Sequence, residues 1–211
     1  MNLLPMRRSR AIFRATGAVV PLGLLMLAGC SVLPEASLDP TRYYVLSGPA
    51  AVVAPQAEAP VVYLRGVEVA RYLHSRPVIV RRGDNEIEFH DFARWGEPLE
   101  QGIARVIRDE LVARGAARAV QISGVRREGA GRDYTLTVRV AACEGGAAGD
   151  VIFRAVWELV ANGGKPRVIG GGEYRAADLR WDGKTEASLT AQLSLAVSGL
   201  AGEVAAALAK K

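Results

Sequence analysis

The sequence predicts an α+β fold: a single domain with a mostly antiparallel mixed sheet and two amphipathic helices packed on one face of it. Two observations lead to this class. About seven or eight short segments rich in β-branched and aromatic residues, mostly separated by turn-forming residues, are typical of strands. Two longer segments repeat their apolar residues every three or four positions, as amphipathic helices do.

The first half of the chain is expected to contribute four strands, at residues 41–47, 61–69, 78–82 and 86–91. An Ala- and Pro-rich loop separates the first two, since proline cannot donate a hydrogen bond to a ladder. Gly83-Asp84-Asn85 stands between the other two and predicts a hairpin.

The first helix is expected to open at Glu97-Pro98, because proline suits the first helical position and a carboxylate suits the positive end of the helix dipole. Gly115 is expected to close it. Its apolar stripe consists of Leu99, Ile103, Val106, Ile107 and Leu111.

The second half is expected to be rich in strands, at 120–125, 132–141, 150–161 and 167–177. The last two should pair around Asn162-Gly163-Gly164. A final helix is predicted over 185–209, with apolar residues every three or four positions: Leu189, Leu193, Val197, Leu200, Val204 and Leu208.

Residues 1–29 are predicted to be an export signal peptide. Four arginines precede an apolar run of 11 residues, 18–28. A membrane-spanning helix would need about 20 apolar residues, whereas a basic start, a short apolar run and a small-residue exit define a signal peptide.

Leu27-Ala28-Gly29-Cys30 resembles the bacterial lipoprotein box. The resemblance implies that Cys30 receives a diacylglycerol on sulfur and, after cleavage, an acyl chain such as palmitate on its new amino group. No other cofactor is implied. Two or more acyl chains anchor a protein stably, and Ser31, where an Asp would imply inner-membrane retention, points to the outer membrane.

These boundaries give three parts: the signal peptide 1–29, a lipidated tether 30–40 and a periplasmic domain 41–211.

Without the signal arginines, 23 basic residues stand against 22 acidic ones, so nucleic acid is not an expected partner. Cys143 has no partner cysteine once Cys30 carries lipid, and the domain must therefore depend on its core.

Candidate catalytic or metal chemistry is sparse. Glu86, Glu88 and His90 share one side of an expected strand, which would suit a metal ion, but a solvated polar face gives the same pattern. Gly170-Gly171-Gly172 precedes a strand rather than a helix, so a bulge fits better than a phosphate loop. No serine lies in a catalytic motif. The sequence therefore predicts neither an enzyme nor a metal site.

The stretch 71–99 brings aromatic, guanidinium and carboxylate groups close together. Trp95 has two interpretations: a core side chain at a strand-to-helix corner, or part of a docking surface, since Trp and Arg are good anchors when a partner desolvates them. The docking hypothesis names Tyr72, Leu73, Arg76, Pro77, Arg94 and Trp95.

The lipoprotein box, Tyr43-Tyr44-Val45-Leu46, Tyr72-Leu73, Arg76-Pro77 and Arg94-Trp95-Gly96-Glu97-Pro98-Leu99 together resemble the auxiliary lipoproteins of ABC-type transport systems, of the PqiC kind. The family usually has Ala where Gly96 stands. The resemblance implies a non-enzymatic, periplasm-facing subunit at the outer membrane that docks an MCE-domain protein in intermembrane lipid transport, and it also implies a homo-oligomeric ring. The alternatives are a periplasmic lipid carrier and an envelope-assembly lipoprotein outside any ABC system.

Overall fold

The computed structural model of the chain describes residues 38–48, 57–122 and 133–210. The chain divides into two units, Met1–Asp39 and Pro40–Lys211, and the sheet and both helices belong to the second. Cys30 and the predicted signal peptide lie outside the described residues.

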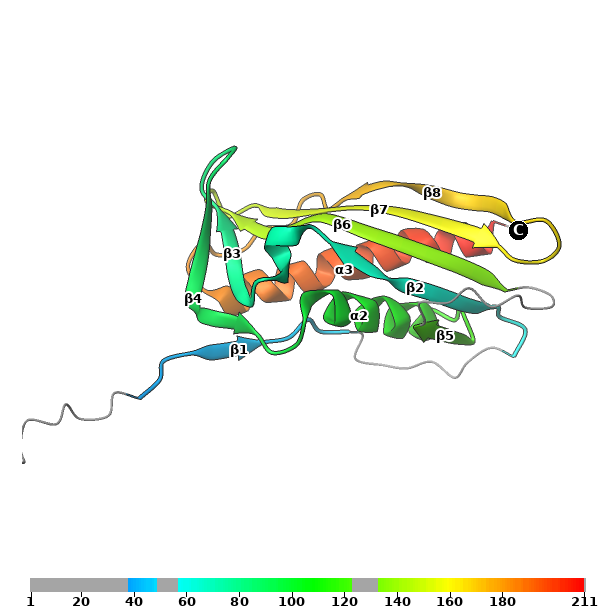
Figure 1. Cartoon of the computed structure of the whole chain (residues 1–211), viewed down its shortest axis with the longest axis horizontal. Coiled ribbons are helices and arrows are strands. Elements are labelled where there is room, and N and C mark those ends of the chain that lie inside the picture. Colours follow the sequence, from blue (N-terminus) through cyan, green and yellow to red (C-terminus); the bar gives the residue numbers. More distant parts are fainter. Residues whose placement is uncertain (1–37, 49–56, 123–132, 211) are drawn as a thin grey trace, which may run out of the picture. The chain divides into compact units, whose positions relative to one another are not determined.

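Eight strands form one mixed sheet (Figure 1), which confirms the predicted α+β class. They are β1 (Arg42–Tyr44), β2 (Val61–Val69), β3 (Pro77–Arg81), β4 (Ile87–Trp95), β5 (Ala119–Ile122), β6 (Tyr134–Gly146), β7 (Val151–Ala161) and β8 (Arg167–Arg175). The neighbours run β1-β4-β3-β6-β2-β5, and β7 and β8 continue from the other edge of β6.

The central strand β6 has two different edges. One edge pairs antiparallel with β7, which pairs antiparallel with β8. The other edge is shared in parallel: β2 pairs with its first half, and β3 pairs with Gly145 and Gly146. A 3-10 helix, Arg71–His74, connects β2 to β3. The sheet therefore forks at this helix.

Antiparallel pairing supplies the two longest ladders, β6–β7 and β7–β8. Four of the seven strand pairings are nevertheless parallel. The predicted hairpin around residues 83–85 is confirmed as the antiparallel pair β3–β4.

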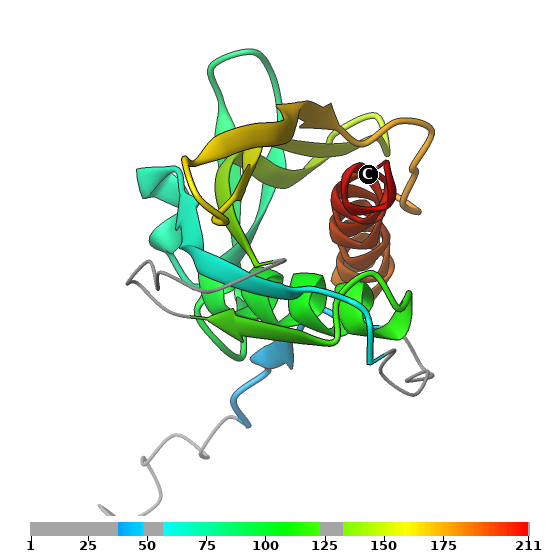
Figure 2. The ribbon, with the colours of Figure 1, turned by 90° about the vertical axis from the view of Figure 1, so that its right-hand side faces the viewer.

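Both helices, α2 (Leu99–Ala113) and α3 (Glu186–Ala209), lie on the same side of the curved sheet (Figure 2). Every residue of the two predicted apolar stripes is buried. Pro98 is the N-cap of α2 and not its first helical residue, so the helix begins at Leu99. Thr185 caps α3, its hydroxyl accepting a hydrogen bond from Ser188 N.

By length and composition, α3 is the one helix among the described residues that is apolar enough to cross a membrane. Ten of its residues are buried. Its exposed residues are mostly small, such as Ala187, Ala191 and Ala206, with Leu195 and the single charged residue Glu203 among them. The apolar composition of α3 therefore agrees with a helix at the centre of a core.

Three strands differ clearly in length from their predictions, and one of them, β4, continues to Trp95 instead of ending at Asp91. β1 ends at Tyr44 because the chain then turns inward: Leu46 is buried, and Ser47 N donates a hydrogen bond to Ser194 Oγ at 2.9 Å. β6 continues five residues beyond Ala141, because a register shift after Val140 returns Cys143 to the core face.

The glycine triplet lies in β8, as the bulge interpretation predicted. The register of β7 and β8 shifts between Val160–Val168 and Leu159–Gly170. A Cβ at Gly170 would lie 2.8 Å from the Cβ of Ala207. The absence of a side chain at this position is therefore what allows α3 to pack closely against β8.

Candidate partner-docking site

The six residues of the docking hypothesis lie around one junction, where the 3-10 helix meets β3 and β4. Trp95 N donates a hydrogen bond to Arg76 O at 2.8 Å, and Pro77 faces Arg94 across the strand pair. We call this junction the β3–β4 corner; it consists of Tyr72, Leu73, Arg76, Pro77, Arg94 and Trp95.

Two members of the β3–β4 corner belong to the core. Trp95 is 4% exposed and faces Tyr44 of β1, and Leu73 is 2% exposed. Neither side chain offers a surface to a partner in this structure. Trp95 therefore occupies the position that the core interpretation predicted, and the sequence alone had left both interpretations open.

The other four members reach the surface. The Arg76 side chain is exposed, and those of Tyr72, Pro77 and Arg94 are half-buried. Arg94 Nε donates a hydrogen bond to Asp91 O at 3.0 Å, which fixes the direction of its side chain. A partner at the corner would therefore meet two guanidinium groups beside a phenol ring and a proline.

An ion pair with one fully buried member lies next to Tyr72 of the β3–β4 corner. Arg81 Nε lies 2.6 Å from Glu144 Oε1, and Glu144 is fully buried. Its other oxygen, Oε2, has no hydrogen-bond partner among the described residues. Burial, together with the Glu144 carboxylate, raises the pKa of the neighbouring Tyr72 to about 12. This pair holds β3 to β6 where the two strands share only two residue pairs.

Arg81 and Glu144 are 63 positions apart, and no local sequence pattern identifies them as partners. The predicted strand ended at Ala141, whereas β6 continues through Glu144 to Gly146. The one indication in the sequence that Glu144 has a partner is that this charged residue directly follows the apolar run Ala141-Ala142-Cys143. Cys143 is buried and free, and burial raises the pKa of its thiol.

The turn from β4 into α2 is fixed by hydrogen bonds to the segment that follows β1. Gly96 N donates to Tyr44 O at 2.8 Å. Arg105 Nη2 bonds both Glu97 Oε1, at 2.5 Å, and Leu46 O, at 2.8 Å. The two segments, far apart in the sequence, are therefore held together beside the β3–β4 corner.

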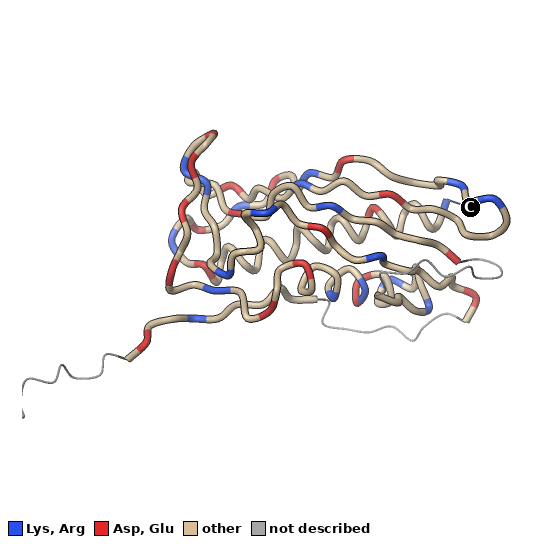
Figure 3. Tube along the Cα trace, viewed as in Figure 1, with Lys and Arg blue, Asp and Glu red and all other residues tan. Residues whose placement is uncertain are grey.

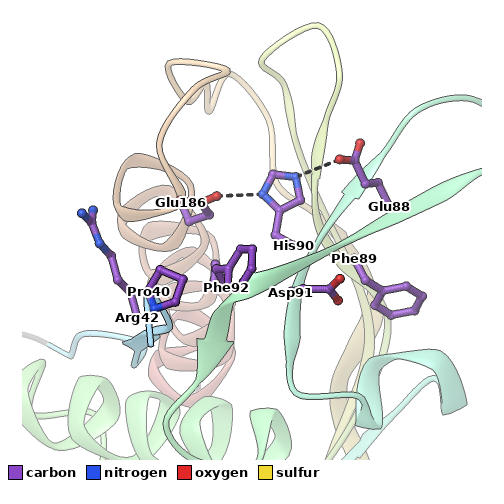
Figure 4. Close-up of a pocket in the computed structure, with 9 residues that line it drawn as sticks. Pro40, Arg42, Glu88, Phe89, His90, Asp91, Phe92 and Glu186 are labelled. Atoms are coloured by element: carbon purple, nitrogen blue, oxygen red, sulfur yellow. Dashed lines mark hydrogen bonds and ion pairs between the residues drawn. The ribbon is translucent and has the colours of Figure 1, made fainter. Parts of the chain in front are cut away.

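A cavity of about 480 Å³ lies near the start of α3, lined by β4, Pro40, Arg42 of β1 and Glu186 (Figure 4). His90 Nδ1 lies 2.8 Å from Glu186 Oε1, and His90 Nε2 lies 3.8 Å from Glu88 Oε1. No group of three His, Cys, Asp or Glu side chains in the described part of the chain is arranged to hold a metal ion. His90 thus links β4 to α3, and the alternative of a Glu-x-Glu-x-His metal site has no support here.

Comparison with solved structures identifies a shared fold. An uncharacterized protein has a TM-score of 0.61 at 16% identity, covering 79% of this chain and 97% of that chain. A Xanthomonas campestris protein of the DUF330 family has a TM-score of 0.60 at 19% identity, covering 77% and 92%. The PelC dodecamer of Paraburkholderia phytofirmans has a TM-score of only 0.31, which supports no inference about assembly. No curated protein matches the sequence at a significant level.

The first two likenesses define the fold class: this chain is an α+β domain with the same fold as those two structures. The sequence match is more specific. Residues 44–205 match the family described as the ABC-type transport auxiliary lipoprotein component, and the chain belongs to that family. The match includes all six residues of the β3–β4 corner.

Proposed function

We propose that this protein is a non-enzymatic outer-membrane lipoprotein of an MCE-type, ABC-driven lipid transport system, and that it docks the MCE-domain protein at the outer membrane. The observation that carries the proposal is the family match over residues 44–205. The lipoprotein box at Cys30 supplies the anchor, through the diacylglycerol and acyl chains that it implies.

The β3–β4 corner is the proposed contact. Its arginines and its tyrosine are side-chain types that carry much of the binding energy when a partner covers them. The Arg81–Glu144 pair and the buried Trp95 give these residues a rigid base. A homo-oligomeric ring, implied by the family resemblance, would repeat this corner around an axis.

Crosslinked co-purification of the lipidated protein from membranes tests the proposal. We expect an MCE-domain protein to be recovered. Arg76→Glu should reduce the recovery several-fold, whereas Arg154→Glu, an exposed arginine on β7, should leave it unchanged. Repeated failure of the unaltered lipidated protein to recover an MCE-domain protein would contradict the proposed function.

A further inference from the structure

Large apolar side chains are exposed where β1 meets β4. Tyr43 is 61% exposed, Phe92 is 62% exposed, and Val45 and Phe89 are also exposed. We call these four residues the β1–β4 patch. The other exposed large apolar side chains in the described part of the sheet and helices stand singly, on β5, β7, β8 and α3.

Three members of the β1–β4 patch, Tyr43, Val45 and Phe92, lie close together, whereas Phe89 lies on the other side of β4. Tyr43 faces Arg94 across the β1–β4 pair, and Phe92 lies two residues before Arg94. The position that a Cβ at Gly96 would take is 3.3 Å from Val45 and 3.9 Å from Tyr43. Phe89 and Phe92 point to opposite sides of β4 (Figure 4). The patch therefore wraps around an edge rather than covering one flat face.

The length of the tether indicates what this edge meets. Eleven residues lie between Cys30 and Arg42, so the chain from one to the other can span at most about 40 Å. The 24 residues of α3 are about 36 Å long, and the helix starts beside β4, at the His90–Glu186 contact. The opposite end of the domain is about one helix length from the point where the tether joins β1. The β1–β4 patch is therefore the part of the described domain that an anchor at Cys30 would bring to a bilayer with the shortest stretch of chain.

The charges around the patch do not favour a strongly charged partner. Arg42 and Arg94 are offset by Glu88 and Asp91, and Figure 3 shows both signs intermingled at this end of the domain. Aromatic side chains with balanced charges are typical of the interface between lipid headgroups and acyl chains. Because Phe89 and Phe92 lie on opposite sides of β4, a flat protein surface could contact only one of them. A fluid bilayer can surround both.

We propose that the β1–β4 patch sits in the interfacial layer of the bilayer to which the chain is anchored, so that the domain is held at two points. This inference rests on the proposed lipidation of Cys30. The second point of attachment fixes the orientation of the domain: α3 begins near the membrane, and Lys210 at its other end is directed away from it.

Site-specific fluorescence of the full-length lipidated protein tests this inference. Tyr43→Cys, Phe92→Cys and the control Val156→Cys, an exposed position on β7, each introduce one accessible thiol for an environment-sensitive label. Native Cys143 is buried, with a raised thiol pKa, and should stay unlabelled. In phosphatidylcholine vesicles, nitroxide-labelled lipid should quench labels at 43 and 92 several-fold more than the label at 156.

Two outcomes would overturn the inference. One is equal quenching by lipid at all three positions. The other is protection of 43 and 92 from both nitroxide lipid and aqueous iodide, which would mean that a second copy or another protein covers the patch. Intact mass of the same samples reports lipidation separately: loss of the acyl chains contradicts the proposed function, whereas anchored protein with unquenched labels contradicts only this inference.

Discussion

Trp95 is the residue that links the two strands of the β3–β4 corner to the core. Its side chain is almost fully buried, while Phe92, three residues earlier on the same strand, is largely exposed. Trp95→Ala should therefore lower the free energy of unfolding by about 3–5 kcal/mol. Phe92→Ala should change it by no more than about 0.5 kcal/mol.

Urea unfolding followed by circular dichroism measures both variants. A loss of similar size in the two would contradict the assignment of Trp95 to the core.

The Arg81–Glu144 pair should respond unequally to loss of its two members. Removing Arg81 leaves a carboxylate that is fully buried, whereas removing the charge of Glu144 leaves a guanidinium that already reaches solvent. Arg81→Met should therefore cost about 3–5 kcal/mol, and Glu144→Gln clearly less. Thermal unfolding of the two variants distinguishes them, and an equal or reversed order would show that the pair does not hold the fork.

Glu186 gives the fold a pH-dependent contribution. Burial is the largest single effect and opposes ionisation of Glu186. The hydrogen bonds from His90 and from the Glu186 backbone, together with the charges of His90 and Arg42, outweigh it, so the pKa of this carboxyl is lowered. Its stabilisation is therefore complete above the unfolded value of about 4.3 and is lost as the pH falls through the lower folded pKa.

Glu186→Gln should accordingly destabilise the protein by about 1 kcal/mol at neutral pH. Below the folded pKa the difference should shrink, because the unaltered protein is then protonated too. Unfolding free energies of both proteins across the acid range test this, and a difference that does not change with pH would assign the effect to packing.

At the scale of elements, the contact between α3 and β8 depends on a missing side chain. A methyl group at Gly170 would press on the Cβ of Ala207 and also approach the ring of Trp157. Because neither neighbour is the end of a flexible chain, α3 would have to move. Gly170→Ala should cost about 1–3 kcal/mol.

Gly83→Ala is the matched control, since a Cβ there would meet nothing within 4 Å. Its unfolding midpoint should stay close to that of the unaltered protein. If both alanine variants behave alike, α3 does not pack against β8 as closely as described.

The elements themselves were largely predictable, because each is recorded in a local pattern. The α2 stripe from Leu99 to Leu111 and the strand at Val61–Val69 follow from apolar spacing alone. The pairing was not predictable. Nothing local in β2 or β3 indicates that both lie in parallel along one edge of β6, since that arrangement depends on the 3-10 helix between them.

The same limit applied to the candidate site. The sequence grouped the residues of the β3–β4 corner correctly, because they are close along the chain. It did not separate buried from exposed members: Trp95 belongs to a core built from distant parts of the chain, and its strand partner Tyr44 is about fifty residues earlier. Glu144 was missed for a similar reason, as its partner Arg81 is 63 positions away.

At the scale of the whole molecule, the proposed lipidation of Cys30 would attach the domain to a membrane through its N-terminal tether, and the proposed docking corner and the apolar edge both lie in that domain. The roles proposed for the β3–β4 corner and the β1–β4 patch both depend on that attachment. The β3–β4 corner can meet a membrane-bound partner, and the β1–β4 patch can reach lipid, only if the chain is anchored near them.

Intact-mass spectrometry of the native protein extracted from outer membranes tests this attachment most directly. The account predicts a chain that begins at Cys30 and carries a diacylglycerol on its sulfur and an acyl chain on its amino group. A chain with an unmodified Cys30, or one that retains residues 1–29, would contradict it.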